Sequence, residues 1–327
     1  MRCNSFFSQA HTAVLTGFQS LSILFLMGST LRALSGETST RFAVKRMTLE
    51  SGEVWSVSNA PSLDLKGAGA RQQLLATAEC SDGLSRDLTR AVTWEVGSSA
   101  VAKVSSQGLL TPVADGETEV TARSADGVVS HLKVTVSEAK VSQPINFPNQ
   151  IVPIFTKLGC NGGGCHGKSG GQNGFRLSLL GFEPTEDYEY LVKESRGRRL
   201  FPSAPDHSLL LQKAVGILPH GGGKRMEPDS RDYQLIRRWI SQGMPYGRPG
   251  DPTVERIDVY PRGRTLDREG EQQLTVKATY TDGSTEDVTA GSQYDSNDKD
   301  TVQVDANGKV KVVGRSEIGR ASCRERV

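Results

Sequence analysis

Two segments of this chain match each other at an offset of 200 residues. The first runs from Gln73 to Thr89 and the second from Gln273 to Thr289, and each contains an Asp-Gly pair followed by Asp-x-Thr. Before the Asp-Gly pair, apolar and polar residues alternate, which is the period of a strand with one buried face. Asp-Gly is a preferred hairpin turn because glycine supplies the positive φ that the turn needs. The repeat therefore predicts one β-domain built twice.

Further strands are predicted after the first Asp-Gly turn, at Val92–Val96, Ala102–Val104, Gly116–Ala122 and His131–Val136. Short strands with turns between them are typical of a β-sandwich. The stretches ATAECSDGLSRDLTRAVTWE and VAKVSSQGLLTPVADGETEVTA resemble the bacterial immunoglobulin-like domain, group 2. The resemblance covers residues 46–138 and again 254–316. It implies two β-sandwiches that serve as spacers or adhesive modules, with a cell-surface ligand as a partner.

The N-terminus has the features of a secretory signal peptide. Arg2 precedes an apolar stretch that ends near Met27, and no acidic residue occurs before Glu37. Small residues precede a cleavage point after Ser35. The alternative is an uncleaved anchor, which the short and interrupted apolar run disfavours. Residues 1–35 are therefore predicted to be removed, leaving an exported protein of the periplasm or cell surface with no membrane span.

The C-terminal residues 317–327 differ in character from the rest of the chain. Ile318 to Val327 match, in order, the translation of a common short-read sequencing adapter. This match predicts that the natural protein continues beyond residue 316 and that the second β-domain is cut short. The formal net charge of the whole chain is +2, which argues against nucleic acid as a partner.

Between the repeats, residues 143–251 have helical patterning. The segment Asn149–Leu158 places apolar residues on one face, with Asn149 as a candidate cap and Pro153 in the first turn. The segment Asp232–Gln242 is amphipathic, and Gly243 follows it as a stop signal. The sequence therefore predicts a small helical domain set between the two β-domains.

The chemistry of this helical segment centres on Cys160, Cys165 and His166. Their Cys-x4-Cys-His pattern is a widened form of the c-type haem attachment pattern, Cys-x2-Cys-His. Two thiols that add across the haem vinyl groups form thioethers, and the adjacent histidine then lies beneath the iron. The pattern predicts Cys160 and Cys165 as covalent attachment sites for haem c and His166 as the proximal iron ligand.

A distal iron ligand is expected from the loop before the last helix. Met226 is the predicted ligand, and His220 and Met244 are the alternatives. Methionine paired with histidine raises the reduction potential of a haem. The predicted function is one-electron transfer to a redox partner protein at the cell envelope, more an electron carrier than an enzyme. The basic run Lys193–Arg199 is either a solvated face or a site that docks an acidic redox partner or a haem propionate.

The central segment resembles the cytochrome c-like domains of planctomycete-type secreted proteins. The resemblance rests on the order of its motifs: a helix at 151–158, the Cys-His loop at 160–166, a Ser-Leu-Leu run at 208–210, His-Gly-Gly-Gly-Lys-Arg at 220–225, and Trp-Ile-x-x-Gly at 239–243. The four-residue cysteine spacing departs from the usual haem pattern. The resemblance implies a multidomain β + α protein in which two immunoglobulin-like β-sandwiches flank a small cytochrome c-like helical domain.

Three other interpretations of the two cysteines stay open. A disulfide is favoured by an exported compartment. A zinc site would use Cys160, Cys165, His166 and a fourth ligand such as His220. A redox-active dithiol normally has a shorter spacing. The alternative function is a non-haem cell-surface adhesion or scaffold protein whose helical insert is stapled by a disulfide.

Overall fold

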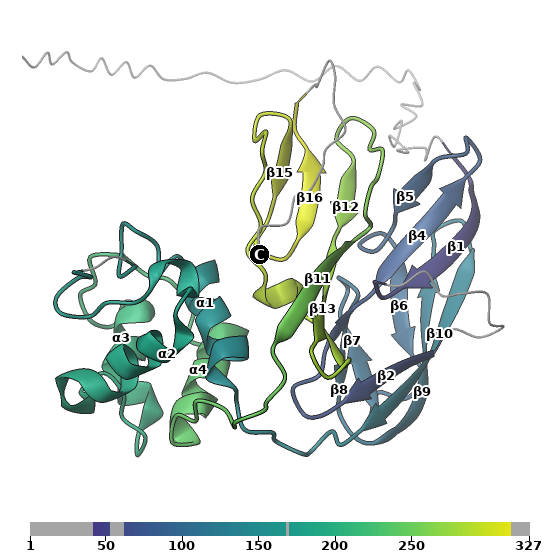
Figure 1. Cartoon of the computed structure of the whole chain (residues 1–327). Coiled ribbons are helices and arrows are strands. Elements are labelled where there is room, and N and C mark those ends of the chain that lie inside the picture. The colour runs from purple at the N-terminus through teal and green to yellow at the C-terminus, as the bar shows by residue number, and fades with distance from the viewer. Residues whose placement is uncertain (1–41, 53–61, 168–169, 315–327) are drawn as a thin grey trace, which may run out of the picture. The chain divides into compact units, whose positions relative to one another are not determined.

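The computed structural model describes residues 42–52, 62–167 and 170–314. The predicted signal peptide, residues 1–35, and the adapter-like tail, residues 317–327, lie outside the described residues. The described part is mostly β, with several separate sheets and a run of short helices (Figure 1).

In the described residues 42–52 and 62–138, the first repeat contains ten strands: β1 (Val44–Glu50), β2 (Ser62–Lys66), β3 (Gln72–Gln73), β4 (Leu75–Cys80), β5 (Ser85–Asp87), β6 (Thr93–Val96), β7 (Ala102–Val104), β8 (Leu109–Pro112), β9 (Gly116–Arg123) and β10 (Val129–Ser137). They form three sheets in the orders β1-β4-β5, β2-β10-β9-β6 and β3-β8-β7. β10 and β2 run parallel, whereas the other paired strands of this repeat are antiparallel. Alternate residues of β10 are buried, which places one face of this sheet on an apolar core.

The second repeat contains β11 (Val254–Tyr260), β12 (Glu271–Gln273), β13 (Thr275–Tyr280), β14 (Thr285–Asp287), β15 (Val302–Val304) and β16 (Lys309–Val312), with a single 3-10 turn, η6 (Thr289–Gly291). Its sheets, β11-β13-β14 and β12-β16-β15, repeat the orders β1-β4-β5 and β3-β8-β7. The register of β1 on β4 shifts between Val44 and Arg46, and that of β11 on β13 shifts between Val254 and Arg256. The two copies therefore share an irregularity of pairing as well as strand order.

In each repeat, two segments of backbone approach each other closely at a glycine. The amide of Leu74 donates to the Gly108 carbonyl at 2.9 Å, and in the second copy Leu274 donates to Gly308 at 2.8 Å. Gly108 has φ +77°, and a Cβ there would lie 2.8 Å from the Leu74 carbonyl oxygen. Only glycine fits this position, because both the positive φ and the close backbone approach exclude a side chain.

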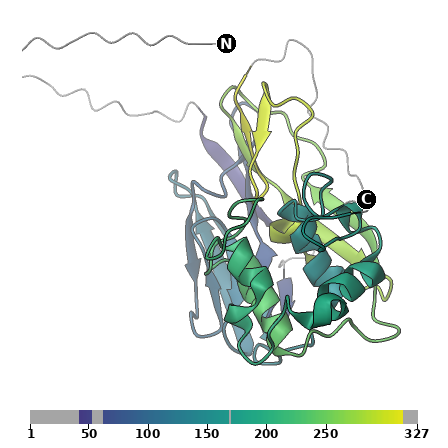
Figure 2. The same ribbon diagram turned by 90° about the vertical axis from the view of Figure 1, so that its left-hand side faces the viewer.

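The helical segment begins with a π-helical turn, η1 (Phe147–Ile151), that continues into α1 (Val152–Lys157). The other helical elements are η2 (Leu179–Gly181), α2 (Pro184–Tyr188), η3 (Glu189–Lys193), η4 (Glu194–Gly197), η5 (Pro205–His207), α3 (Leu209–Ala214) and α4 (Arg231–Ser241). Figure 2 draws this segment in teal and green. Phe147, Leu191, Leu211, Ile236 and Trp239 form the fully buried centre of its apolar core.

The start of the first helix differs from the sequence-based prediction. The side chain of Asn146, not that of Asn149, caps it, because Asn146 Oδ1 accepts a hydrogen bond from the Asn149 amide at 3.0 Å. The last helix, α4, begins after Ser230, whose hydroxyl accepts from the Tyr233 amide. Within the described part of the chain, no helix combines the length and apolarity that a bilayer span requires.

Replacing Gly108 by alanine should lower the free energy of unfolding by roughly 2–5 kcal/mol, because the new Cβ is strained in φ and overlaps the Leu74 carbonyl. Gly127→Ala is the matched control, since Gly127 also has positive φ (+83°) but open space around it. It should cost only about 1–2 kcal/mol. Urea denaturation measures both, and equal losses would contradict the proposed backbone clash.

Candidate functional site

The Cys-His loop follows α1 and is held by its own backbone. Gly159 turns the chain with φ +71°, and the Cys160 amide then donates to the Phe155 carbonyl at 2.8 Å. The His166 amide donates to the Cys160 carbonyl at 3.0 Å, and His166 in turn accepts from the Leu177 amide at 2.8 Å. These bonds draw the two cysteines and the histidine into one compact turn. The sequence pattern is therefore also a local cluster in space.

Cys160 packs against the apolar core of the helical segment. Burial raises the pKa of its thiol to about 11, and the nearby Arg225 guanidinium opposes that rise. A thiol with so high a pKa is almost entirely protonated at neutral pH and is a poor nucleophile. Cys160 is therefore expected to react slowly as a thiolate at neutral pH in this environment.

Cys165 lies in a more polar environment. A guanidinium nitrogen of Arg225 lies 3.6 Å from Cys165 Sγ, and its other terminal nitrogen lies 3.5 Å from the Leu158 carbonyl oxygen. Cys80, Cys160 and Cys165 are free thiols in this structure. Arg225 thus links the last turn of α1 to the cysteine loop.

His166 is oriented by a backbone carbonyl. Its Nδ1 lies 2.9 Å from the Phe175 carbonyl oxygen, and its ring centre lies 4.6 Å from the ring centre of Phe175. A carbonyl oxygen only accepts, so Nδ1 carries the proton and Nε2 keeps its lone pair in the neutral ring. Burial lowers the pKa of His166, with the His220 ring as a further lowering influence. His166 therefore presents a neutral Nε2, the state in which imidazole binds a metal ion.

His220, in the loop 220–225, is oriented by a backbone carbonyl in the same way as His166. Its Nδ1 lies 2.9 Å from the Gly223 carbonyl oxygen, which leaves its Nε2 as the free position. The rings of His166 and His220 are nearly parallel, with planes 8° apart and centres 6.3 Å apart. Two loops that are distant in sequence thus bring two similarly oriented imidazoles together.

The two candidate methionines are placed differently. Met226 is 8% exposed and belongs to the apolar core of the helical segment, while its amide lies 3.2 Å from the Ala214 carbonyl. Met244 packs against the same core, and its amide donates to the Trp239 carbonyl at 3.0 Å. Both side chains contribute to the packing around Trp239.

The four residues of the zinc interpretation, Cys160, Cys165, His166 and His220, do not assemble into a metal-binding cluster. Across residues 42–52, 62–167 and 170–314, no group of three or more His, Cys, Asp or Glu side chains is placed to hold a metal ion. A four-ligand zinc site requires such a tetrahedral group. The geometry here instead offers separate thiols and a pair of imidazoles.

The basic run 193–199 is only partly a solvated face, which corrects the sequence-based interpretation. Arg199 is 4% exposed. Its guanidinium donates to the carbonyl oxygens of Tyr190 at 2.8 Å and Gly174 at 2.7 Å, and it lies over the Phe175 ring. Arg199 is therefore a structural residue that supports Phe175 behind His166. Sequence reasoning missed both Arg199 and Phe175, because neither belongs to a ligand pattern.

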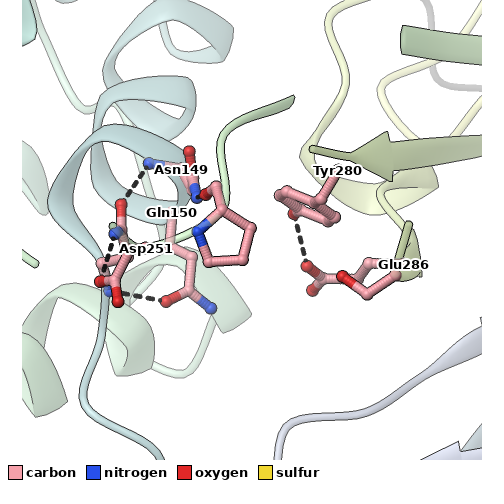
Figure 3. Close-up of a pocket in the computed structure, with 8 residues that line it drawn as sticks. Asn149, Gln150, Asp251, Tyr280 and Glu286 are labelled. Carbon is pink, nitrogen blue, oxygen red and sulfur yellow. Dashed lines mark hydrogen bonds between the residues drawn. The ribbon is translucent and has the colours of Figure 1, made fainter. Parts of the chain in front are cut away.

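A shallow pocket of about 200 Å³ lies away from the Cys-His loop (Figure 3). Its lining comes from Asn146, Asn149, Gln150, Asp251, Pro252, Tyr280, Ser284 and Glu286. Tyr280 donates to Glu286 at 2.8 Å, and Asn149 donates to the Pro252 carbonyl at 2.8 Å. These side chains already have hydrogen-bond partners, and the pocket lies between η1 and the β13–β14 hairpin of the second repeat.

Comparison with known proteins bears on the first repeat. Residues 55–136 match the bacterial Ig-like domain (group 2). The chain therefore contains a bacterial immunoglobulin-like domain. This match confirms the resemblance inferred for the first repeat and the β-rich fold that it implied. The cytochrome c-like character of the helical segment, the planctomycete resemblance, the haem and the iron ligands stay predictions.

More distant similarities extend over other parts of the chain. Ice-binding protein 1 of Shewanella frigidimarina (strain NCIMB 400) is 22% identical over 292 residues, which cover 86% of this chain and 28% of that protein. An intimin mutant of EHEC O157:H7 aligns with 28% of this chain and 47% of its own, at 16% identity and a TM-score of 0.20. The surface layer protein SbsC, domains 1–6, aligns with 84% of this chain and 25% of its own, at 12% identity and a TM-score of 0.22. The chain thus spans little more than a quarter of the length of its curated relative.

The haem-free protein should alkylate slowly at Cys160. At pH 8 a thiol with a pKa of about 11 is ionised in roughly one molecule in a thousand, so the rate should rise about tenfold per pH unit up to pH 11. Iodoacetamide labelling followed by peptide mass spectrometry measures this rate, with urea-unfolded protein as the control. Equal rates for folded and unfolded Cys160 at pH 8 would contradict the buried placement of this thiol.

Proposed function

We propose that this chain is an exported scaffold or adhesion protein of the cell surface, built on two immunoglobulin-like repeats that pair through the same residues. The observation that carries the proposal is a reciprocal contact between the repeats, here called the Asp–Gln clasp. It consists of Asp87 and Gln73 in the first repeat and of Asp287 and Gln273 in the second. Group 2 immunoglobulin-like domains are modules of surface proteins, in keeping with the predicted export.

One half of the clasp centres on Asp287. Its Oδ2 accepts from the Gln73 amide at 2.5 Å and from Gln72 Nε2 at 2.9 Å, while its Oδ1 accepts from the Thr289 amide at 2.8 Å. Asp287 is only 7% exposed. Burial raises its pKa, and the hydrogen bonds from Thr289 and Gln73 counteract that rise. A buried carboxylate of this kind is tolerated because amides surround it.

The other half repeats these contacts at an offset of 200 residues. Asp87 Oδ2 accepts from the Gln273 amide, and Asp87 Oδ1 accepts from the Thr89 amide at 2.7 Å. Gln273, 1% exposed, also accepts a hydrogen bond at 3.0 Å from Arg90. Each repeat therefore offers the other the same donor and the same acceptor, as in an isologous interface.

The clasp distinguishes this protein from a flexible string of domains. Hydrogen bonds to a charged group contribute more than neutral ones, and they are lost together if the repeats separate. Arg86 adds an ion pair across the repeats, with a guanidinium nitrogen 2.7 Å from the Asp267 carboxylate. Paired repeats would hold the helical segment on a rigid support, and rigidity is the property that a surface scaffold needs.

Asp287→Ala should lower the free energy of unfolding by about 2–4 kcal/mol, because it leaves the buried Gln73 and Thr289 amides without an acceptor. Asp282→Ala is the matched control, since Asp282 occupies the exposed hairpin turn of the same repeat and bonds only within it. It should have a small effect. Urea denaturation gives the stabilities, and small-angle scattering should show a larger radius of gyration for Asp287→Ala alone. The same stability and the same radius of gyration in the two variants would contradict a role of the Asp–Gln clasp in pairing the repeats.

Export and surface location are tested directly in the producing cell. The mature protein should begin at Gly36, as measured by mass spectrometry of its N-terminal peptide. Protease added to intact cells should remove the protein from the surface fraction, with a cytoplasmic protein as the protected control. A chain that keeps residues 1–35 and resists protease in intact cells would contradict the scaffold proposal.

A second candidate function, covalent haem binding by the helical segment, is favoured by the Cys-His loop. The two thiols are free, and His166 is held with its Nε2 available. Beside the loop, Leu179 and Leu180 are more than half exposed and Phe182 is 83% exposed. Exposed apolar side chains of this size mark surfaces that contact a ligand or partner. These features fit a flat apolar group attached at Cys160 and Cys165.

In this second candidate, the chain's own residues have distinct roles. Cys160 and Cys165 would hold the haem as thioethers, and His166 would bind its iron. Phe175 would keep the His166 ring in one tautomer, in the way that hydrogen-bonded outer groups orient metal-binding histidines. The haem, when bound, would supply one-electron redox chemistry.

A pyridine haemochrome spectrum after acid-acetone extraction tests this candidate. The full chain, expressed with c-type haem maturation, should retain a c-type spectrum, because covalent haem survives extraction. Cys165→Ala should shift the band, since one thioether is lost, whereas Cys80→Ala should leave the spectrum unchanged. If all haem is extracted from the wild-type chain, and Cys160 and Cys165 are oxidised to each other, the haem candidate is contradicted. The scaffold function would then be the remaining proposal.

A further inference from the structure

We propose that His220, rather than Met226, is the second axial ligand of the haem iron, opposite His166. This inference rests on the haem candidate of the proposed function and adds to it the identity of the distal ligand. It is drawn from the placement of four side chains: the two imidazoles and the two methionines of the helical segment.

The spacing of the two rings suits a shared metal ion. Two imidazoles bound through Nε2 on opposite sides of one ion have ring centres roughly 6 Å apart, because each metal–nitrogen bond is about 2.0 Å long. The centres of His166 and His220 are 6.3 Å apart, and their planes are 8° apart.

Both rings are held by the same device. His166 Nδ1 bonds to the Phe175 carbonyl and His220 Nδ1 to the Gly223 carbonyl, each at 2.9 Å. A backbone carbonyl on Nδ1 selects the tautomer in which Nε2 is the free ligand position. One histidine in this state is common in proteins, but here two of them lie close together, with nearly parallel rings, on two glycine-rich loops.

The loop that carries His220 is shaped around its ring. The Gly223 amide donates to the His220 carbonyl at 2.9 Å, and Gly223 has φ +71°. A Cβ on Gly222 would lie 3.1 Å from the His220 ring and 3.3 Å from the Arg225 guanidinium. Glycine at 222 therefore lets the imidazole fold back over its own loop.

The two methionines serve the apolar core instead. Met226 is buried in the apolar core that contains Trp239. Met244 packs against the same core, and its amide donates a hydrogen bond to the Trp239 carbonyl. Moving either thioether to an iron ligand position would remove it from this packing and leave a void. The histidine pair requires no such rearrangement of the core. Two nitrogen ligands would also give a lower reduction potential than a methionine–histidine pair.

The test uses the full chain expressed with c-type haem maturation and follows its electronic absorption and electron paramagnetic resonance spectra. The wild-type ferric protein should be low-spin and should lack the weak near-infrared charge-transfer band of a methionine–iron bond. His220→Ala should lose the low-spin spectrum, and added imidazole should restore it. His220→Met should gain the methionine band. Met226→Leu, the matched control, should keep the wild-type spectrum.

Two results would overturn the inference, and a misfolded variant has a substitute. A methionine band in the wild type, or a spectrum that changes in Met226→Leu and not in His220→Ala, would overturn the inference while leaving covalent haem intact. A His220→Ala protein that is misfolded by circular dichroism would be replaced by His220→Met, whose spectrum decides alone. A wild-type chain that carries no haem, under conditions where a control cytochrome is matured, would overturn the haem candidate and this inference together.

Discussion

Amide hydrogen bonds to two carboxylates, those of Asp87 and Asp287, are the interaction on which the pairing of the β-repeats depends. Each carboxylate serves two purposes: one oxygen accepts the amide of the threonine two residues later, and the other accepts the amide of a glutamine from the opposite repeat. A bare buried carboxylate would be costly, so each site is stable only while both repeats are in place. The local turn and the contact between repeats are therefore parts of one structure.

The helical segment follows a different principle. Its stability comes from an apolar core around Trp239, and its chemistry lies at the edge of that core. Cys160 lies against the core, where burial suppresses the ionisation of its thiol. His220 and the half-buried His166 lie in loops, where backbone carbonyls hold both rings. Arg199 and Arg225, which no ligand pattern singles out, connect these groups to the surrounding backbone.

Local sequence patterns predicted local structure well. The Asp-Gly pair at 82–83 forms the expected turn, in which Asp82 accepts from the Leu84 amide and Gly83 has positive φ. The amphipathic run 232–242 corresponds to α4. The start of the first helix was predicted less well. Its cap is Asn146, because helical structure begins at Phe147, before the apolar periodicity can be seen in the sequence. The basic run was misjudged at Arg199, since burial of an arginine depends on carbonyl groups from separate segments.

The sequence by itself determined the existence of two similar β-repeats, the helical character of the insert, and the grouping of Cys160, Cys165 and His166. Strand alternation, turn chemistry and motif spacing depend on residues that are close in sequence, so they can be recognised without knowledge of the tertiary structure. Only the tertiary structure decided that Asp287 bonds to Gln73, 214 residues away, and that the His220 ring lies near and parallel to that of His166 while Met226 is buried. These contacts join side chains from distant segments, and their geometry depends on how whole repeats and loops pack.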